Sequence, residues 1–227
     1  MADRRATARS MRGFTLVELL VALAVMALLS VMSWRGLDAM SRTQALTQTR
    51  SNAVQALRNG LAQWVADLDA MDTDLPAART LRSTPSPLEW DGLSLRITRH
   101  SADTEGPGLQ VVAWTARTEQ GRKVWLRWQS PTVRSRAALQ LAWTQAAQWA
   151  ENPSAASRAN QVRIVPLLDW QLFYFRGDSW SNPSSTADAA SVTPDAIRLQ
   201  LHLPEDQPLS GKVTRDWMRA TAGGSKS

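Results

Sequence analysis

A single carboxylate interrupts the longest apolar stretch of this 227-residue chain. Glu18 closes the segment Gly13-Phe14-Thr15-Leu16-Val17-Glu18, and the apolar run continues over residues 19–34. An ionisable group in apolar surroundings costs free energy, so Glu18 is a functional candidate by default. A carboxylate there can pair with a cation, and the small residue Gly13 can present its peptide bond to a protease without steric cost.

The order of the parts differs from that of a secretory signal peptide. A signal peptide carries its cleavage site after the apolar region, whereas the candidate site here, Gly13, precedes it. Cleavage at Gly13 would remove a basic leader, residues 1–13, and keep the hydrophobic helix. The leader carries Arg4, Arg5, Arg9 and Arg12. An uncleaved signal anchor with a chance glycine is the alternative, and the apolar run alone does not separate the two.

The basic leader followed by Gly-Phe-Thr-Leu-Val-Glu-Leu-Leu resembles the type III signal of type IV prepilins and type II secretion pseudopilins. The resemblance implies that a prepilin peptidase cuts between Gly13 and Phe14 and N-methylates Phe14. Glu18 lies one helical turn after Phe14, where it is well placed to pair with the N-terminal amine of a neighbouring subunit. Such a pair sets register better than it adds stability. The competing interpretation is that Glu18 snorkels to the cytoplasmic headgroups, and both can hold at different times.

Residues 14–34 are long enough to cross a bilayer once. At about 1.5 Å per residue, a helix over this range spans roughly 30 Å, the thickness of a hydrocarbon core. The positive leader places the N-terminus in the cytoplasm, so the globular part is expected outside the inner membrane, in the periplasm of a Gram-negative cell. The chain has no cysteine and therefore uses no disulfide in that compartment.

The charge balance argues against a nucleic-acid-binding protein. The chain holds 26 Lys and Arg against 20 Asp and Glu, a formal net charge of +6. Removal of the leader takes away four arginines and Asp3, which leaves 22 basic and 19 acidic residues, a net +3. No block rich in lysine or arginine is present, so nucleic acid is not expected among the partners.

The helix is expected to continue beyond the membrane. No proline occurs before Pro76, and apolar residues recur at spacings of three and four over residues 54–68. One long helix is therefore predicted from about residue 14 to about residue 69. Its first half is membrane or filament, and its second half, in the continuation segment at 35–75, packs one face on a globular domain. Gly36 and Gly60 weaken this prediction, because a glycine inside a helix lowers its stability by about 1 kcal/mol relative to Ala.

From Leu88 onward the pattern changes to the alternation that is typical of half-buried strands. Strands are predicted at residues 93–97, 111–115, 124–128, 139–143, 162–165, 170–176, 197–203 and 213–218, with a hairpin turn at Gly121. Loops are predicted at 101–108, 152–160 and 177–194, and a disordered tail at 222–227. The expected fold is α+β and pilin-like: a long N-terminal helix, its first half transmembrane, packed on a mostly antiparallel β domain over residues 76–221.

Residues that could catalyse a reaction are scarce. His100 and His202 are the only histidines, no ligand spacing connects them, and there is no cysteine nucleophile. The most tempting site is an acidic cluster at the end of the helix, Asp67, Asp69, Asp72 and Asp74. It is a weak calcium candidate because the loop and closing glutamate of an EF-hand are missing, and a solvated helix end is the preferred interpretation. No catalytic residue, cofactor or metal is expected.

Tryptophan is unusually frequent, with 11 Trp against 3 Phe and 1 Tyr. A group of these rings could form a sugar- or peptide-binding face, a core or a subunit interface: Trp114, Trp125, Trp128, Trp143 and Trp149. Subunit contact is favoured over a ligand, because Trp is enriched at interface hot spots. Trp125 and Trp128 fall on opposite faces of one predicted strand, so at least one is expected to be exposed or at an interface.

Within the pilin family, the chain is most similar to the J-type minor pseudopilins of type II secretion. The similarity lies in Trp34-Arg35-Gly36-Leu37-Asp38-Ala39 and, in the C-terminal half, in residues 172–176, Trp180 and residues 194–199. It implies an assembly subunit, not an enzyme, that joins other minor and major pseudopilins in a pseudopilus tip complex supporting export of folded proteins. A minor pilin of a type IV pilus is the runner-up, and a signal-anchored periplasmic enzyme or binding module is the competing class.

Overall fold

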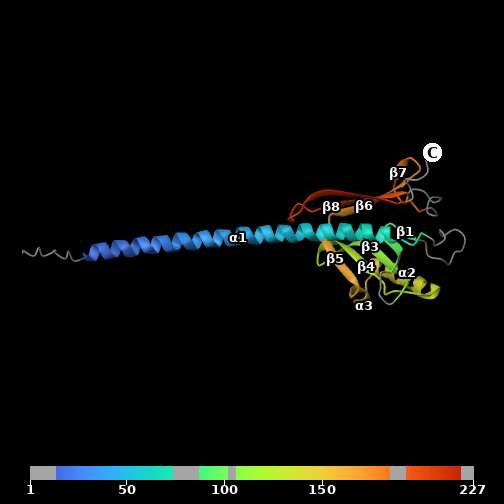
Figure 1. Ribbon diagram of the computed structural model, residues 1–227, viewed down its shortest axis with the longest axis horizontal. Coiled ribbons are helices and arrows are strands. Elements are labelled where there is room, and N and C mark those ends of the chain that lie inside the picture. The colour runs from blue at the N-terminus through green and yellow to red at the C-terminus, as the bar shows by residue number, and fades with distance from the viewer. Residues whose placement is uncertain (1–13, 74–86, 102–105, 185–192, 221–227) are drawn as a thin grey trace, which may run out of the picture. The chain divides into compact units, whose positions relative to one another are not determined.

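The computed structural model describes residues 14–73, 87–101, 106–184 and 193–220 (Figure 1). The chain divides into two compact units, Met1–Thr49 and Arg50–Ser227, which are called here the N-terminal unit and the β unit. The predicted leader and tail lie outside the described residues, and so do Gly13 and Asp74.

A 54-residue helix, α1 (Leu16–Asp69), begins in the N-terminal unit and ends in the β unit. The predicted long helix is therefore confirmed. In the N-terminal unit every described side chain is exposed. Four hydroxyl side chains there, those of Ser30, Thr43, Thr47 and Thr49, donate hydrogen bonds to backbone carbonyls of the same helix. The Ser30 hydroxyl, for example, donates to the Met26 carbonyl at 2.8 Å. Such back-bonding satisfies a hydroxyl group without water.

Two antiparallel sheets build the β unit. The first, sheet A, has the order β1-β2-β3-β4-β5 and consists of β1 (Leu88–Trp90), β2 (Ser94–His100), β3 (Leu109–Glu119), β4 (Arg122–Gln129) and β5 (Gln161–Pro166). The second, sheet B, has the order β7-β6-β8-β9 and consists of β6 (Asp169–Arg176), β7 (Ser179–Ser181), β8 (Ala196–Leu203) and β9 (Gly211–Met218). The β3–β4 hairpin turns at Gln120 and Gly121, both with positive φ, as its two-residue loop requires.

The C-terminal part of α1 lies between the two sheets (Figure 1). It buries Trp64 and Leu68 in a core that also takes side chains from sheet A, such as Leu95, Ile97, Trp114 and Trp125, and from sheet B, such as Leu172, Ile197, Leu199 and Trp217. Gly60 is buried here, because the α1 backbone passes directly over Ile164 and Trp125. The α+β, pilin-like prediction is confirmed.

A second helix, α2 (Arg136–Glu151), corrects one prediction, since residues 139–143 were expected to form a strand. The Ser135 hydroxyl caps this helix by accepting a hydrogen bond from the Ala138 N–H at 3.2 Å. The buried residues of α2 recur at helical spacing: Leu139, Ala142, Trp143, Ala146, Trp149 and Ala150. A short helix, α3 (Ala155–Arg158), likewise occupies the loop predicted at 152–160, and Ser154 caps it.

The tryptophans correct a second prediction. Trp125 and Trp128 do lie on opposite faces of β4, yet they are only 0% and 2% exposed. Sheet A is covered on both faces, by α1 on one and by α2 on the other, so opposite faces do not imply exposure. The other three rings of the predicted interface face, Trp114, Trp143 and Trp149, are buried as well. All five are core residues rather than a surface for a subunit or a ligand.

Candidate functional site

Of the two predicted processing residues, Gly13 lies outside the described residues, and Phe14 is the first residue that the structure describes. Phe14 is 83% exposed, and α1 starts two residues later. The hydroxyl of Thr15 accepts a hydrogen bond from the backbone N–H of Glu18 at 3.3 Å. Thr15 therefore caps the helix, and Glu18 is the acidic residue of the first turn, where it favours the positive end of the helix dipole. Sequence reasoning missed this cap, although Thr-x-x-Glu before an apolar run is its signature.

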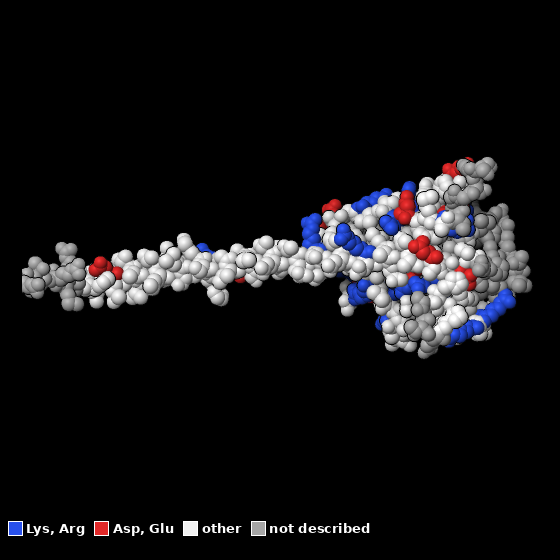
Figure 2. Space-filling model, in the orientation of Figure 1, with Lys and Arg blue, Asp and Glu red and all other residues white. Residues whose placement is uncertain are grey.

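The following stretch of α1, residues 19–34, is apolar apart from Ser30 and Ser33, and all its side chains are exposed. Leu20 and Leu23, for example, are each more than half exposed, and none of the apolar window is buried. Charged side chains are sparse along this stretch (Figure 2). Among the described residues, α1 is long and apolar enough to span a membrane by length and composition. Exposed apolar surface of this extent marks a membrane or protein contact.

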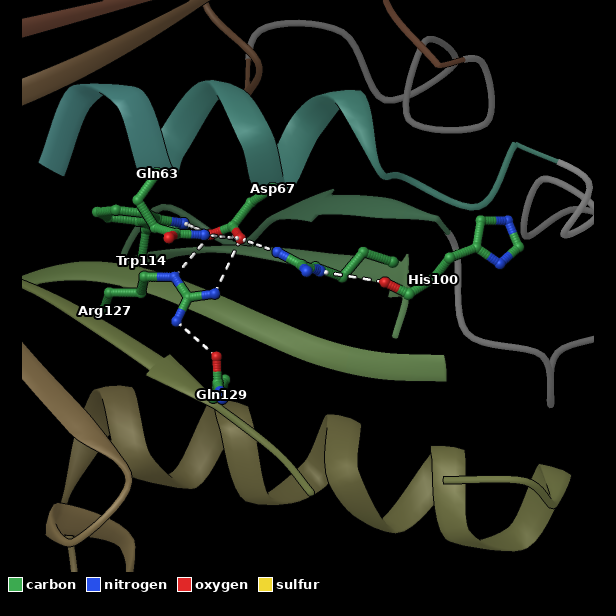
Figure 3. A network of polar contacts seen from close by, with 7 residues as sticks. Gln63, Asp67, His100, Trp114, Arg127 and Gln129 are labelled. Carbon is green, nitrogen blue, oxygen red and sulfur yellow. Dashed lines mark hydrogen bonds and ion pairs between the residues drawn. The ribbon is translucent and has the colours of Figure 1, made fainter. Parts of the chain in front are cut away.

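A buried carboxylate joins α1 to sheet A in the β unit (Figure 3). Asp67 is 0% exposed and receives five hydrogen bonds. Arg127 of β4 donates two, at 2.7 and 2.8 Å, and Arg99 of β2 donates one at 2.6 Å. Trp114 of β3 and Gln63 of α1 each donate one at 2.9 Å. Both carboxylate oxygens are thus saturated by donors from one helix and three strands.

This group of residues, the Asp67 anchor, sets register rather than performing chemistry. The side chains of Arg99 and Arg127 are only 13% and 8% exposed, so each cation depends on the Asp67 carboxylate. Arg127 is held from its other side, because its Nη1 donates to the Gln129 amide oxygen at 2.7 Å. Any other position of α1 on sheet A would separate Asp67 from these arginines and leave buried charges unpaired, which costs free energy. The ion pairs therefore disfavour alternative positions of the helix.

Three members of the predicted acidic cluster, Asp67, Asp69 and Asp72, lie in the described residues, and each has a different partner. Asp67 is engaged by arginines, and Asp69 accepts a hydrogen bond from the Trp217 indole at 2.7 Å. Asp72 lies 3.8 Å from the His100 imidazole. Within the described ranges, no three His, Cys, Asp or Glu side chains are arranged to hold a metal. The interpretation as a solvated helix end was wrong for Asp67 and Asp72, which are both buried.

A second ion cluster lies at the end of the β3–β4 hairpin. Burial raises the pKa of Glu119, but hydrogen bonds from Arg117 and Gln161 and the charges of Arg117 and Arg163 outweigh burial. The pKa of Glu119 therefore lies below its ordinary value of 4.5. Arg117 also donates to the Trp149 carbonyl at 2.7 Å, which satisfies an acceptor in the last turn of α2.

The N-terminal segment matches a known sequence family. Residues 8–34 match the model described as the prokaryotic N-terminal methylation motif. The chain is also 26% identical to type II secretion system protein J of Vibrio cholerae serotype O1, over 96% of this chain and 90% of that protein. The chain thus carries a prepilin-type methylation motif and is similar to type II secretion system protein J. A protein of the same name from Klebsiella pneumoniae is 44% identical over 59 residues, which are 26% of this chain and 30% of that one.

The two similarities cover different parts of the structure. The methylation motif covers Gly13, Phe14, Glu18 and the first turns of α1. The similarity to the Vibrio cholerae protein extends through the β unit, so it does not depend on the apolar helix alone. Together they support a minor pseudopilin of type II secretion that is anchored to a membrane by α1.

Proposed function

We propose that this chain is a minor pseudopilin that assembles with other minor and major pseudopilins into the tip of a type II secretion pseudopilus. One observation carries the proposal: a methylation motif at the start of α1 belongs to a chain that resembles protein J over nearly its whole length. The structure offers an exposed apolar helix for assembly and a separately packed β unit with two cores. The tip complex would support export of folded proteins, and the chain itself would catalyse nothing.

The proposal includes processing and orientation. A prepilin peptidase would cut after Gly13 and methylate Phe14, with the leader on the cytoplasmic side and the β unit in the periplasm. Residues 14–34 would hold the protein in the inner membrane until assembly. Glu18 would then pair with the amine of a neighbouring subunit, in a seam where an unpaired charge is costly.

Deletion of the gene and complementation with the full chain test this function. We expect the deletion to abolish release of secreted proteins into the medium, while those proteins accumulate in the periplasm. Complementation restores release, and complementation with a chain that lacks residues 14–34 does not. Normal release in the deletion strain, together with lost surface pili, would overturn the proposal in favour of a type IV minor pilin.

A further inference from the structure

Four strands form the edges of the two sheets, and three of them are poor templates for another strand. β1 and β7 are only three residues long. β5 ends at Pro166 and meets β4 with a register shift between Val124 and Leu126. Short strands, prolines and irregularities are devices by which sheets avoid pairing at their edges. β9 has none of these three, because it is eight residues long, lacks proline and pairs without interruption with β8. Its one protective feature of this kind is its exposed charged side chains, which also suit it to an oppositely charged partner.

The outer backbone groups of β9 can be assigned from one hydrogen bond. The Arg219 N–H, directly after the strand, donates to the Asp195 carbonyl at 2.9 Å, and this continues the β8–β9 register. Hydrogen-bonded pairs alternate with non-bonded pairs in an antiparallel ladder, so odd-numbered residues of β9 face β8. Even-numbered residues direct their N–H and C=O groups away from the sheet: Lys212, Thr214, Asp216 and Met218.

The side chains of β9 favour one kind of partner. Lys212 and Arg215 are exposed and form no ion pair within the part of the chain that the structure describes. Asp216, the acidic residue of the strand, is held by Arg198 through hydrogen bonds of 2.7 and 2.8 Å. Arg215 also acts electrostatically on Asp216, so the strand carries two exposed cations and one carboxylate that Arg198 already holds. The edge therefore has a net positive charge. A second copy of β9 would add another Lys212 and Arg215 to the same seam, opposite Asp216 carboxylates that Arg198 already holds. The resulting excess of positive charge disfavours pairing with a second copy.

We propose that β9 is a docking edge for an extended, acidic segment of another protein, which adds to sheet B as a fifth strand. Main-chain hydrogen bonds supply the affinity, and Lys212 and Arg215 select carboxylates on the incoming strand. Met218, which is 71% exposed, offers an apolar contact at the end of the edge. Since the proposed function is assembly, the segment would belong to a neighbouring subunit.

Thr214 allows the backbone and the side chain to be tested separately. Its N–H points away from β8, so Thr214→Pro removes an outward donor and keeps the β8–β9 ladder, a placement that sheets tolerate for proline. Thr214→Ala is the matched control, because it removes the same side chain and keeps the donor. The probe is a short, labelled peptide of alternating Thr and Val with two glutamates three residues apart. A second peptide has lysines at those two positions. Binding to the purified full chain in detergent micelles is followed by fluorescence anisotropy.

The acidic peptide should bind the wild type and Thr214→Ala alike, and should bind Thr214→Pro about tenfold more weakly, as expected for the loss of a main-chain hydrogen bond. The double variant Lys212→Glu with Arg215→Glu should reverse the preference toward the lysine peptide, which tests the edge without a proline. No binding to the wild type, equal binding to the Pro and Ala variants, or no reversal would overturn the proposal.

A third outcome concerns pairing with a second copy. The chain has no cysteine, so Thr214→Cys provides a single thiol at the edge. Efficient crosslinking of this variant to itself, in the absence of peptide, would make a second copy the occupant and overturn the proposal. None of these measurements involves secretion, so the docking edge and the proposed function can fail separately.

Discussion

The Asp67 carboxylate accepts two hydrogen bonds from the Arg127 guanidinium, although the two residues are 60 positions apart in the chain. The pair connects the last turns of α1 to β4, a strand with neighbours on both sides in sheet A. Apolar packing around Trp64 and Leu68 would tolerate small rotations of the helix. A buried ion pair whose hydrogen bonds are all made does not tolerate such rotations, so it fixes one position of α1 on the sheet.

Asp67→Asn should lower the free energy of unfolding of the β unit by about 3–5 kcal/mol, because Arg99 and Arg127 stay buried without an anion. Asp69→Asn is the matched control, since an amide oxygen can still accept the hydrogen bond from Trp217, and its effect should stay below about 1 kcal/mol. Chemical denaturation of the full chain in detergent, followed by tryptophan fluorescence, gives both values. If both variants had similarly small effects on the free energy of unfolding, Asp67 would not anchor α1 to sheet A.

Gly60→Ala should destabilise the β unit by about 1–3 kcal/mol, because overpacking outweighs the better helix propensity of alanine. A Cβ at residue 60 would overlap the Cγ2 of Ile164 and lie 3.2 Å from the Trp125 ring. Gly36→Ala is the matched control in the same helix, because nothing lies within 4 Å of a Cβ there. Its effect should be neutral or stabilising by about 1 kcal/mol. Equal melting of both variants would contradict the close approach.

Glu119 should make the β unit sensitive to acid. Its pKa is lower in the folded state than its ordinary value of 4.5, so the unfolded chain binds more protons in this range. The stabilisation is therefore fully present above that value and is lost as the pH falls through the lowered pKa. Glu119→Gln should flatten the loss of stability between about pH 5 and about pH 3, measured by urea denaturation at each pH. An unchanged slope would mean that the carboxylate is not linked to folding.

The sequence carried enough local information for the long helix and for most of the strands. α1 was predicted from the absence of proline before Pro76 and from the spacing of apolar residues. β8 was predicted from the alternation of apolar and polar residues over 197–203. The error at residues 139–143 came from a short window, because a run of five residues fits both periods. Extended to residue 150, the same residues follow the helical spacing of α2.

The contacts around Asp67 depend on tertiary structure and could not be predicted in the same way. Arg99 and Arg127 lie 32 and 60 residues away, so no local pattern connects them to Asp67. One signal was present: Asp67 is in phase with Trp64 and next to Leu68 on the buried face of the helix. The burial of Trp128 was missed for a related reason, because the alternation of β4 does not reveal that α2 covers its second face.

Processing should depend on the size and charge of residue 13. Gly13→Ala should be cut in part, whereas Gly13→Glu should block cleavage, because a small residue leaves the backbone free to adopt the geometry that a protease needs. Mass spectrometry of the mature wild-type protein should find N-methylated Phe14 as the first residue. An intact Met1 terminus, or a cut after Trp34, would contradict the prepilin interpretation.

Glu18→Gln should impair assembly while leaving cleavage intact. The cleaved bond lies upstream, and glutamine at this position of a capping box supports the helix start as glutamate does. What the variant removes is the negative charge. If Glu18 pairs with the amine of a neighbouring subunit, that amine is left unpaired in a seam of low dielectric, at a cost of about 3–5 kcal/mol before any discount for residual water.

Thr15→Ala separates this pairing from helix capping. It deletes the hydroxyl that accepts the Glu18 N–H, and should cost about 1 kcal/mol of helix stability while the charge remains. Secretion assays and crosslinking between N-terminal helices are the measurements. Glu18→Gln should reduce both clearly, and Thr15→Ala should reduce both weakly. Normal secretion and crosslinks in Glu18→Gln would refute the pairing and leave snorkelling, because an amide also reaches the headgroups. A tip subunit has few neighbours, so the defect is expected to be clear but incomplete.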